Sequence, residues 1–92
     1  TMSEHRKKPP KTQRELLDEL YAGVQTGTLE LSEAVKAMRR ISGLNQEDFA
    51  RHRGISVQSL RLIESNTGNP TVATLNKVAK VFGLKVGFVS AR

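Results

Sequence analysis

The chain of 92 residues contains no cysteine and no tryptophan, and its aromatic residues are three Phe and one Tyr. Without cysteine, neither a disulfide framework nor a cysteine-based zinc site can form. The two histidines, His5 and His52, do not stand at the HxxxH or HExxH spacing that places a metal pair on one helix face. We therefore expect no metal and no cofactor.

Long apolar runs are missing as well. No stretch approaches the roughly 20 apolar residues of a membrane-spanning helix, and no signal-peptide core is present. These absences predict a soluble, cytoplasmic protein without a membrane partner. The sequence also has no phosphate-binding loop, no nucleophile with a paired base and no metal cluster, so we expect no enzyme activity.

Basic residues are abundant by contrast. The formal net charge is +6 and the isoelectric point is near 10.2. The positive charge is concentrated in residues 1–13 and 31–84, whereas residues 14–30 carry four acids and one arginine. Such a balance favours a polyanionic partner, with nucleic acid as the first candidate. A single-strand binder is disfavoured because the few aromatics lie at core-like positions and form no stacking platform.

The N-terminal part divides into an arm and a helix. Residues 1–11 have little apolar content and contain Pro9-Pro10, which predicts a flexible basic arm. The arm is either an inert solvated tail or a segment that follows phosphates or enters a minor groove. Residues 12–27 predict a helix with an apolar stripe, begun by a capping box of Thr12 and Glu15. The stripe is too short for a domain, so this helix packs on the central domain, on a second copy or on another protein.

Residues 44–64 predict two short helices joined by a tight turn. Asn45 and Ser56 are suitable N-caps, and Gly54 can adopt the positive φ that ends a helix abruptly. Two capped helices separated by about three residues form a helix-turn-helix. We place this motif in a domain of residues 28–84.

Two further helices flank the motif. One is expected over residues 33–42 after the cap Ser32, and the other extends from the cap Thr71 to about Phe82. Residues 84–89 are short and β-prone, and a lone strand lacks partners for its backbone groups. We expect this strand to pair with its copy across a two-fold axis, with Val86, Phe88 and Val89 at the dimer contact. The alternative is a tail, residues 85–92, that lies against the helices.

Residues 32–84 resemble the phage-repressor (Cro/C1, Xre-type) helix-turn-helix family. The matching residues are Gly43-Leu44-Asn45-Gln46-Glu47-Asp48-Phe49-Ala50, Gly54-Ile55-Ser56, Leu60, Ile63-Glu64, Asn69-Pro70-Thr71, Leu75 and Val78-Ala79. The resemblance implies an all-α, five-helix repressor-like domain, to which residues 12–27 add an extra N-terminal helix and residues 85–92 a short strand. These two additions look like antitoxin-type members, which dimerise and repress their own promoter, often beside a toxin.

In helix-turn-helix docking, the second helix enters the major groove of double-stranded DNA with its N-terminus first. The side chains expected at base edges are Val57, Gln58, Ser59, Arg61 and Leu62. Gln58 suits a bidentate contact to adenine, Arg61 a guanine or a phosphate, and Val57 the methyl group of thymine.

Other site residues follow from the resemblance or from their place beside the motif. The phosphate contacts that we expect are Gln46, Ser56, Asn66, Thr67, Asn69 and Thr71. In the family, the residue at Gln46 bonds a phosphate beside a helix N-terminus. Arg39 and Glu64 stand where the family commonly has an ion pair that holds the recognition helix. Arg53 stands where most members have a small or apolar residue, which leaves its direction open.

These expectations combine into a homodimeric repressor of transcription. Two recognition helices about 34 Å apart would read a palindromic operator with half-sites one turn apart. The alternative function is an antitoxin that neutralises a toxin protein and regulates its own promoter.

Overall fold

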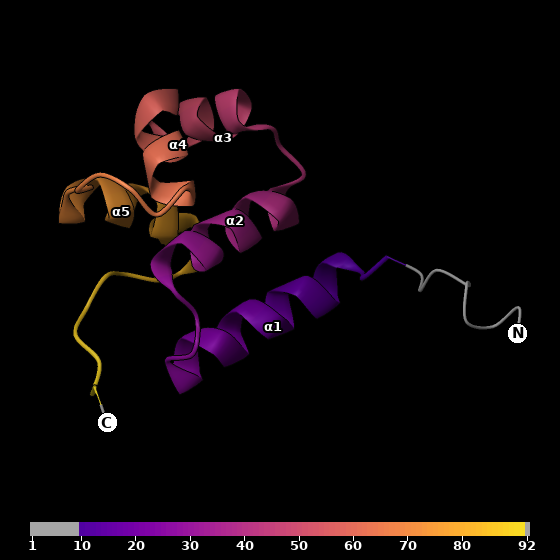
Figure 1. Cartoon of the computed structure of the whole chain (residues 1–92). Helices are drawn as coiled ribbons and strands as arrows, with labels where there is room; N and C mark the ends of the chain where they lie inside the picture. Colours follow the sequence, from indigo (N-terminus) through magenta and orange to yellow (C-terminus); the bar gives the residue numbers. More distant parts are fainter. Residues whose placement is uncertain (1–9, 92) are drawn as a thin grey trace, which may run out of the picture.

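The computed structural model describes residues 10–91, and within that range the regular structure is entirely helical (Figure 1). Its elements in chain order are α1 (Gln13–Thr26), α2 (Leu31–Ser42), α3 (Gln46–Arg53), α4 (Val57–Glu64), α5 (Val72–Ala79) and the 3-10 turn η2 (Lys80–Phe82). None of the helices in the described range is long and apolar enough to cross a membrane. The arm expected over residues 1–11 lies almost wholly outside the described residues.

The helix count differs from the expectation in one respect. A helix is present where residues 12–27 predicted one, but it is the first of five α-helices and not an addition to a five-helix domain. The last predicted helix, to Phe82, is α5 only as far as Ala79, after which the chain tightens into η2. The described chain from residue 28 to residue 84 thus holds four α-helices and one 3-10 turn.

Local capping explains where most helices begin. Thr12, Asn45, Ser56 and Thr71 each accept a hydrogen bond from the backbone N–H three residues later, which satisfies a donor that the first turn leaves free. The expected cap Ser32 was wrong. The cap of α2 is Glu30, whose side chain forms a reciprocal capping box with Glu33. Ser32 is instead buried in the first turn of the helix.

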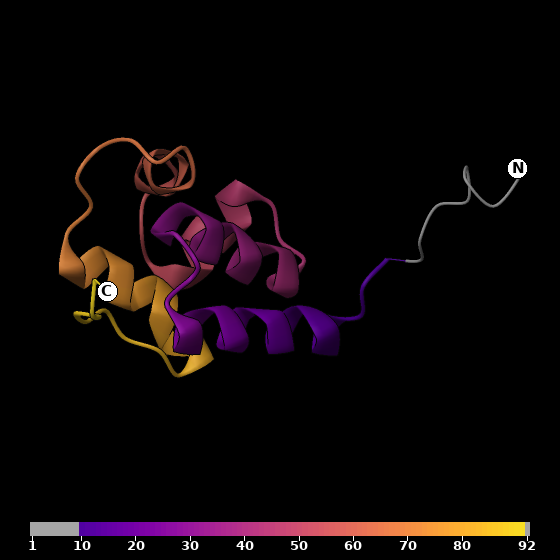
Figure 2. The ribbon, with the colours of Figure 1, turned by 60° about the horizontal axis from the view of Figure 1, so that its bottom comes forward.

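One hydrophobic core joins all five helices. Its buried members are Leu20, Val35, Met38, Ile41, Phe49, Ala50, Leu60, Ile63, Leu75 and Val78. Leu20 of α1 is only 1% exposed, and Gln13 Nε2 of the same helix donates to the carbonyl oxygen of Ile41 at 2.8 Å. In both ribbon views α1 runs alongside α2 (Figures 1 and 2). Of the three partners considered for α1, the structure has it packed on the central domain of its own chain.

The expected C-terminal strand is absent from the described residues of the single chain, and its pairing with a second copy stays a prediction. Residues 84–91 form no strand, and the tail lies against the helices, which was the alternative arrangement. The physical reason is that the described chain offers no second strand, so the backbone N–H of Val86 bonds instead to Asn76 Oδ1 of α5 at 2.8 Å. Leu84 packs on the core, whereas Phe88 and Val89 are exposed.

Candidate nucleic-acid interface

The turn between α3 and α4 is built by the three consecutive residues Gly54, Ile55 and Ser56. Gly54 adopts φ 72°, a left-handed conformation that favours glycine, and the N–H of Ile55 bonds to the carbonyl oxygen of Ala50 at 3.0 Å. Ile55 packs on the core, and Ser56 then caps α4 at once by accepting from the N–H of Ser59 at 3.0 Å. Because the turn is closed at both ends, the direction of α4 relative to α3 is set locally.

The outer face of α4 carries the residues expected at base edges. Gln58, Arg61 and Leu62 are exposed, and among the described residues Gln58 forms no side-chain hydrogen bond. Val57 and Ser59 are half-buried, because Val57 packs against the core and Ser59 Oγ receives a hydrogen bond from Ser56 Oγ at 2.8 Å. Three of the five expected side chains are therefore exposed, and the other two are half-buried.

Arg61 is not free on this face. Its Nη2 lies 3.2 Å from Glu47 Oε2, and its Nε donates to Gln46 Oε1 at 3.4 Å. Both partners belong to the first turn of α3, so Arg61 bridges the two helices of the motif. Arg61 was predicted at a base edge, and its pair with Glu47 was not predicted. The spacing of 14 residues between them has no helical signature, so sequence patterns could not identify the pair.

The ion pair expected between Arg39 and Glu64 is present. Arg39 Nε and Nη2 donate to the two carboxylate oxygens of Glu64 at 2.7 and 2.9 Å, the parallel two-bond geometry that suits a guanidinium. Gln46 Nε2 adds a third bond to Glu64 at 3.1 Å. The carboxylate of Glu64 is 5% exposed. The pair therefore ties the C-terminal parts of α2 and α4 to the start of α3.

The pKa of Glu64 reflects two opposing effects. Burial raises the pKa, but the hydrogen bonds from Arg39 and Gln46, with the charges of Arg39 and Lys36, outweigh it and leave the pKa below the ordinary value of 4.5. The hydrogen bonds with Glu64 in turn raise the pKa of Arg39. Glu64 is thus held as a carboxylate at neutral pH.

The loop after α4 brings the expected phosphate-contact residues beside the face of α4. Asn66 adopts φ 60°, and Asn66, Thr67, Asn69 and Thr71 are all exposed. The hydroxyl of Thr67 bonds to that of Ser65 at 2.7 Å, and Thr71 caps α5. A hollow of about 160 Å³ joins the loop to the helix, lined by Ser59, Leu62, Asn69, Pro70, Thr71 and Thr74. The structure therefore brings two phosphate-contact candidates, Asn69 and Thr71, beside two base-contact candidates, Ser59 and Leu62.

Arg53 points inward. Its guanidinium carbon lies 4.5 Å from the centroid of the Phe49 ring and 5.9 Å from that of Phe82, and Nη2 donates to Ser42 Oγ at 3.1 Å. Burial lowers the pKa of this guanidinium from its ordinary value. Its contacts are those of a cation–π interaction with the core. The direction that the sequence left open is inward.

Metal ligation has no support within the described range, since residues 10–91 contain no group of three or more His, Asp or Glu side chains that could hold an ion. The expected DNA-contact residues on α3, α4 and the following loop carry amides, hydroxyls, one guanidinium and two apolar side chains. The polar groups among these make hydrogen bonds to base edges and phosphates.

The Arg39–Glu64 pair makes a first prediction about stability. Replacing Arg39 by alanine leaves the buried carboxylate of Glu64 without its charged partner. The free energy of unfolding at pH 7 should therefore fall by about 3 kcal/mol. This is the lower end of the range for a broken buried pair, because the Arg39 side chain is 26% exposed. Urea unfolding should show this loss. Arg40→Ala is the control, because Arg40 is the next residue and forms no ion pair within residues 10–91. Equal stability of the two variants would contradict the assignment.

The same pair predicts a pH dependence. Because the pKa of Glu64 is lowered in the folded state, its stabilising effect is complete above the unfolded value near 4.5 and is lost as the pH falls through the folded value. The stability difference between the wild type and Glu64→Gln should therefore shrink in acid, as measured by thermal melts. A stability difference that stays constant with pH would contradict the lowered pKa of Glu64.

Comparison with known proteins agrees with this geometry. A protein-family model described as helix-turn-helix matches residues 35–89, which is more than half of the chain. An uncharacterized HTH-type transcriptional regulator of Methanocaldococcus jannaschii is 36% identical over 52 residues, covering 56% of this chain and 79% of the relative. No solved structure matches the chain significantly. With its capped α3, its glycine turn and its exposed α4, the chain belongs to the Cro/C1-type (Xre-like) helix-turn-helix family.

Proposed function

We propose that the protein is a sequence-specific regulator of transcription that binds double-stranded DNA through α4. The observation that carries the proposal is the outer face of α4, where Gln58 is exposed and without a partner among the described residues. The family, the name of the Methanocaldococcus jannaschii relative and the net charge of +6 all support it.

In this proposal the exposed side chains of α4 contact the base edges. Gln58 reads adenine through a bidentate amide contact, and Leu62 offers an apolar surface to thymine methyl groups. Arg61 contacts guanine or a phosphate once it leaves Glu47. Ser59 and Val57 contribute from the edge of the face, since both are half-buried.

Phosphate contacts surround this face. Gln46 and Ser56 begin the two helices of the motif, and Thr71 begins α5, so free backbone N–H groups at these N-termini favour an anion. Asn66, Thr67 and Asn69 extend the same surface along the loop. Gln46 has two tasks in this proposal, because its side chain also bonds to Glu64.

We infer that the protein acts as a homodimeric repressor at a palindromic operator. A small domain with one reading helix contacts few base pairs, and a two-fold dimer doubles that number with two helices about 34 Å apart. Dimerisation through Val86, Phe88 and Val89 fits their exposure, which is 37%, 107% and 75%.

The test of the function is selection of bound duplexes from a random DNA pool. The expected result is an enriched palindrome whose half-sites are centred one helical turn apart. An unselective pool, or a preference for single strands, would contradict the proposal. Enrichment of a single half-site would support sequence-specific DNA binding but contradict the palindromic operator bound by a dimer.

Gln58→Ala and Arg61→Ala are predicted to lower specific affinity more than non-specific affinity. Loss of a bidentate base contact costs about 1–3 kcal/mol of discrimination, whereas charge attraction to the backbone is sequence-independent and unchanged by Gln58→Ala. Gel shifts with the selected operator and with an unrelated duplex measure both. Gln25→Ala, an exposed glutamine of α1, is the matched control. Equal falls in both affinities would exclude base readout.

Glu47→Gln is predicted to strengthen non-specific DNA binding. Glu47 competes with DNA for Arg61, and removal of one negative charge from this surface should raise non-specific affinity a few-fold. Asp18→Asn removes the same charge from the exposed Arg14–Asp18 pair of α1 and is the control. Binding to an unrelated duplex at several salt concentrations measures the change. Equal behaviour of the two variants would show that Glu47 does not compete for Arg61.

An antitoxin role is the second candidate. The exposed apolar residues of the tail, Phe88 and Val89, are the observation in its favour, because a toxin protein could cover them. A small protein encoded next to this one that co-purifies with it would support this role. If no such protein co-purifies, the DNA-binding regulator without an antitoxin role is the remaining candidate.

A further inference from the structure

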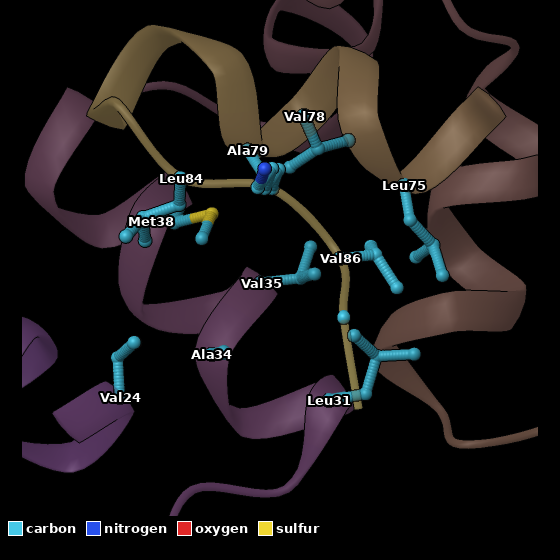
Figure 3. A pocket seen from close by; sticks show the side chains of 12 residues that line it. Val24, Leu31, Ala34, Val35, Met38, Leu75, Val78, Ala79, Leu84 and Val86 are labelled. Carbon is cyan, nitrogen blue, oxygen red and sulfur yellow. The ribbon is translucent and has the colours of Figure 1, made fainter. Parts of the chain in front are cut away.

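An apolar cavity of about 210 Å³ lies on the side of the molecule where the chain ends (Figure 3). Val24 closes it from α1, Leu31 and Met38 from α2, and Leu75 from α5. The tail crosses its mouth, with Val86 on the side of Leu75. An engineered apolar cavity of about 150 Å³ stays dry and takes up benzene. The space is therefore of the size that a phenyl ring can occupy.

The mouth of the cavity is surrounded by exposed apolar side chains. Val24 and Leu31 are 39% and 43% exposed, and Val86 is 37% exposed. Two residues further along the tail, Phe88 is 107% exposed and touches essentially nothing in the described chain. One molecule thus has both an open apolar cavity and, beside it, an uncovered phenyl ring.

The path of the tail explains why Phe88 does not fill the cavity of its own chain. The bond from the Val86 N–H to Asn76 Oδ1 holds the tail beside α5, so Val86 borders the cavity on the side of Leu75, while Val24 and Leu31 at the rim remain exposed. Phe88 lies two residues farther along the tail, where its side chain is exposed and does not line the cavity.

We propose that the cavity receives Phe88 from a second copy of this chain, and that the second copy receives Phe88 in return. This inference rests on the dimer of the proposed function and specifies its contact. A two-fold dimer is self-complementary, so a donor ring and an acceptor cavity on the same patch are satisfied together by one symmetry operation. The contact replaces the strand ladder expected from sequence, since it needs side-chain burial and no backbone pairing.

Analytical ultracentrifugation of the full chain tests the contact. Phe88→Ser should raise the dimer dissociation constant roughly a hundredfold or more, because two phenyl rings per dimer lose their burial. Val81→Ser removes an apolar side chain that is 63% exposed on η2 and should leave the constant unchanged. Dimerisation of Phe88→Ser as tight as that of the wild type would overturn the inference.

A second variant tests the cavity itself. Ala34 lines the cavity and is half-buried, so Ala34→Leu fills part of the space and should weaken the dimer while circular dichroism shows a folded chain. A mixture of Ala34→Leu with Phe88→Ser restores one of the two contacts, since an intact Phe88 meets an open cavity. The mixture should therefore dimerise more tightly than either variant alone. No recovery would overturn the reciprocal arrangement.

The outcomes separate this contact from the DNA-binding function. Binding of a single selected half-site depends on α4, so Phe88→Ser should retain the affinity of the wild type for a half-site. A wild type that stays monomeric, or that loses another bound protein on Phe88→Ser, overturns the second copy as occupant. A wild type that dimerises through Phe88 but selects no DNA would refute the function and leave the contact standing.

Discussion

The buried carboxylate of Glu64 is the constraint on which the arrangement of the motif depends. A carboxylate that is 5% exposed must be paired, and Arg39 of α2 and Gln46 of α3 are its partners. The three side chains come from three helices, so the requirement of one group sets how those helices meet. The shared core of Phe49, Leu60 and Ile63 gives cohesion beneath this network, but packing alone is less directional than hydrogen bonds.

This constraint has a consequence for the outer face of α4. With the far end of α4 held by Arg39 and its beginning held by the cap Ser56, the helix presents Gln58 and Leu62 to solvent in a fixed orientation. Arg61 is held too, by Glu47, but in an exposed pair of modest energy. In the proposed function, DNA binding exchanges the partners of Arg61 on a surface that needs little rearrangement, and such preorganisation favours affinity.

The C-terminal tail lies outside this hydrogen-bond network. A single extended segment without a neighbouring strand cannot satisfy its backbone groups in a ladder, and Asn76 provides one acceptor only. The tail therefore covers part of a cavity and leaves Phe88 outside.

The amino-acid sequence by itself determined the features that arise within a few residues. The caps Thr12, Asn45, Ser56 and Thr71, and the turn at Gly54, depend on local hydrogen bonds and backbone sterics, and the apolar spacing of the helices depends on their period. The Arg39–Glu64 pair was anticipated only through family resemblance. The tertiary structure decided the rest. It packs α1 on its own chain, turns Arg53 inward and leaves Val57 half-buried. It also pairs Arg61 with Glu47 and leaves the tail without a strand. Each of these depends on how separate helices approach one another, and residue spacing along the chain carries no information about that distance.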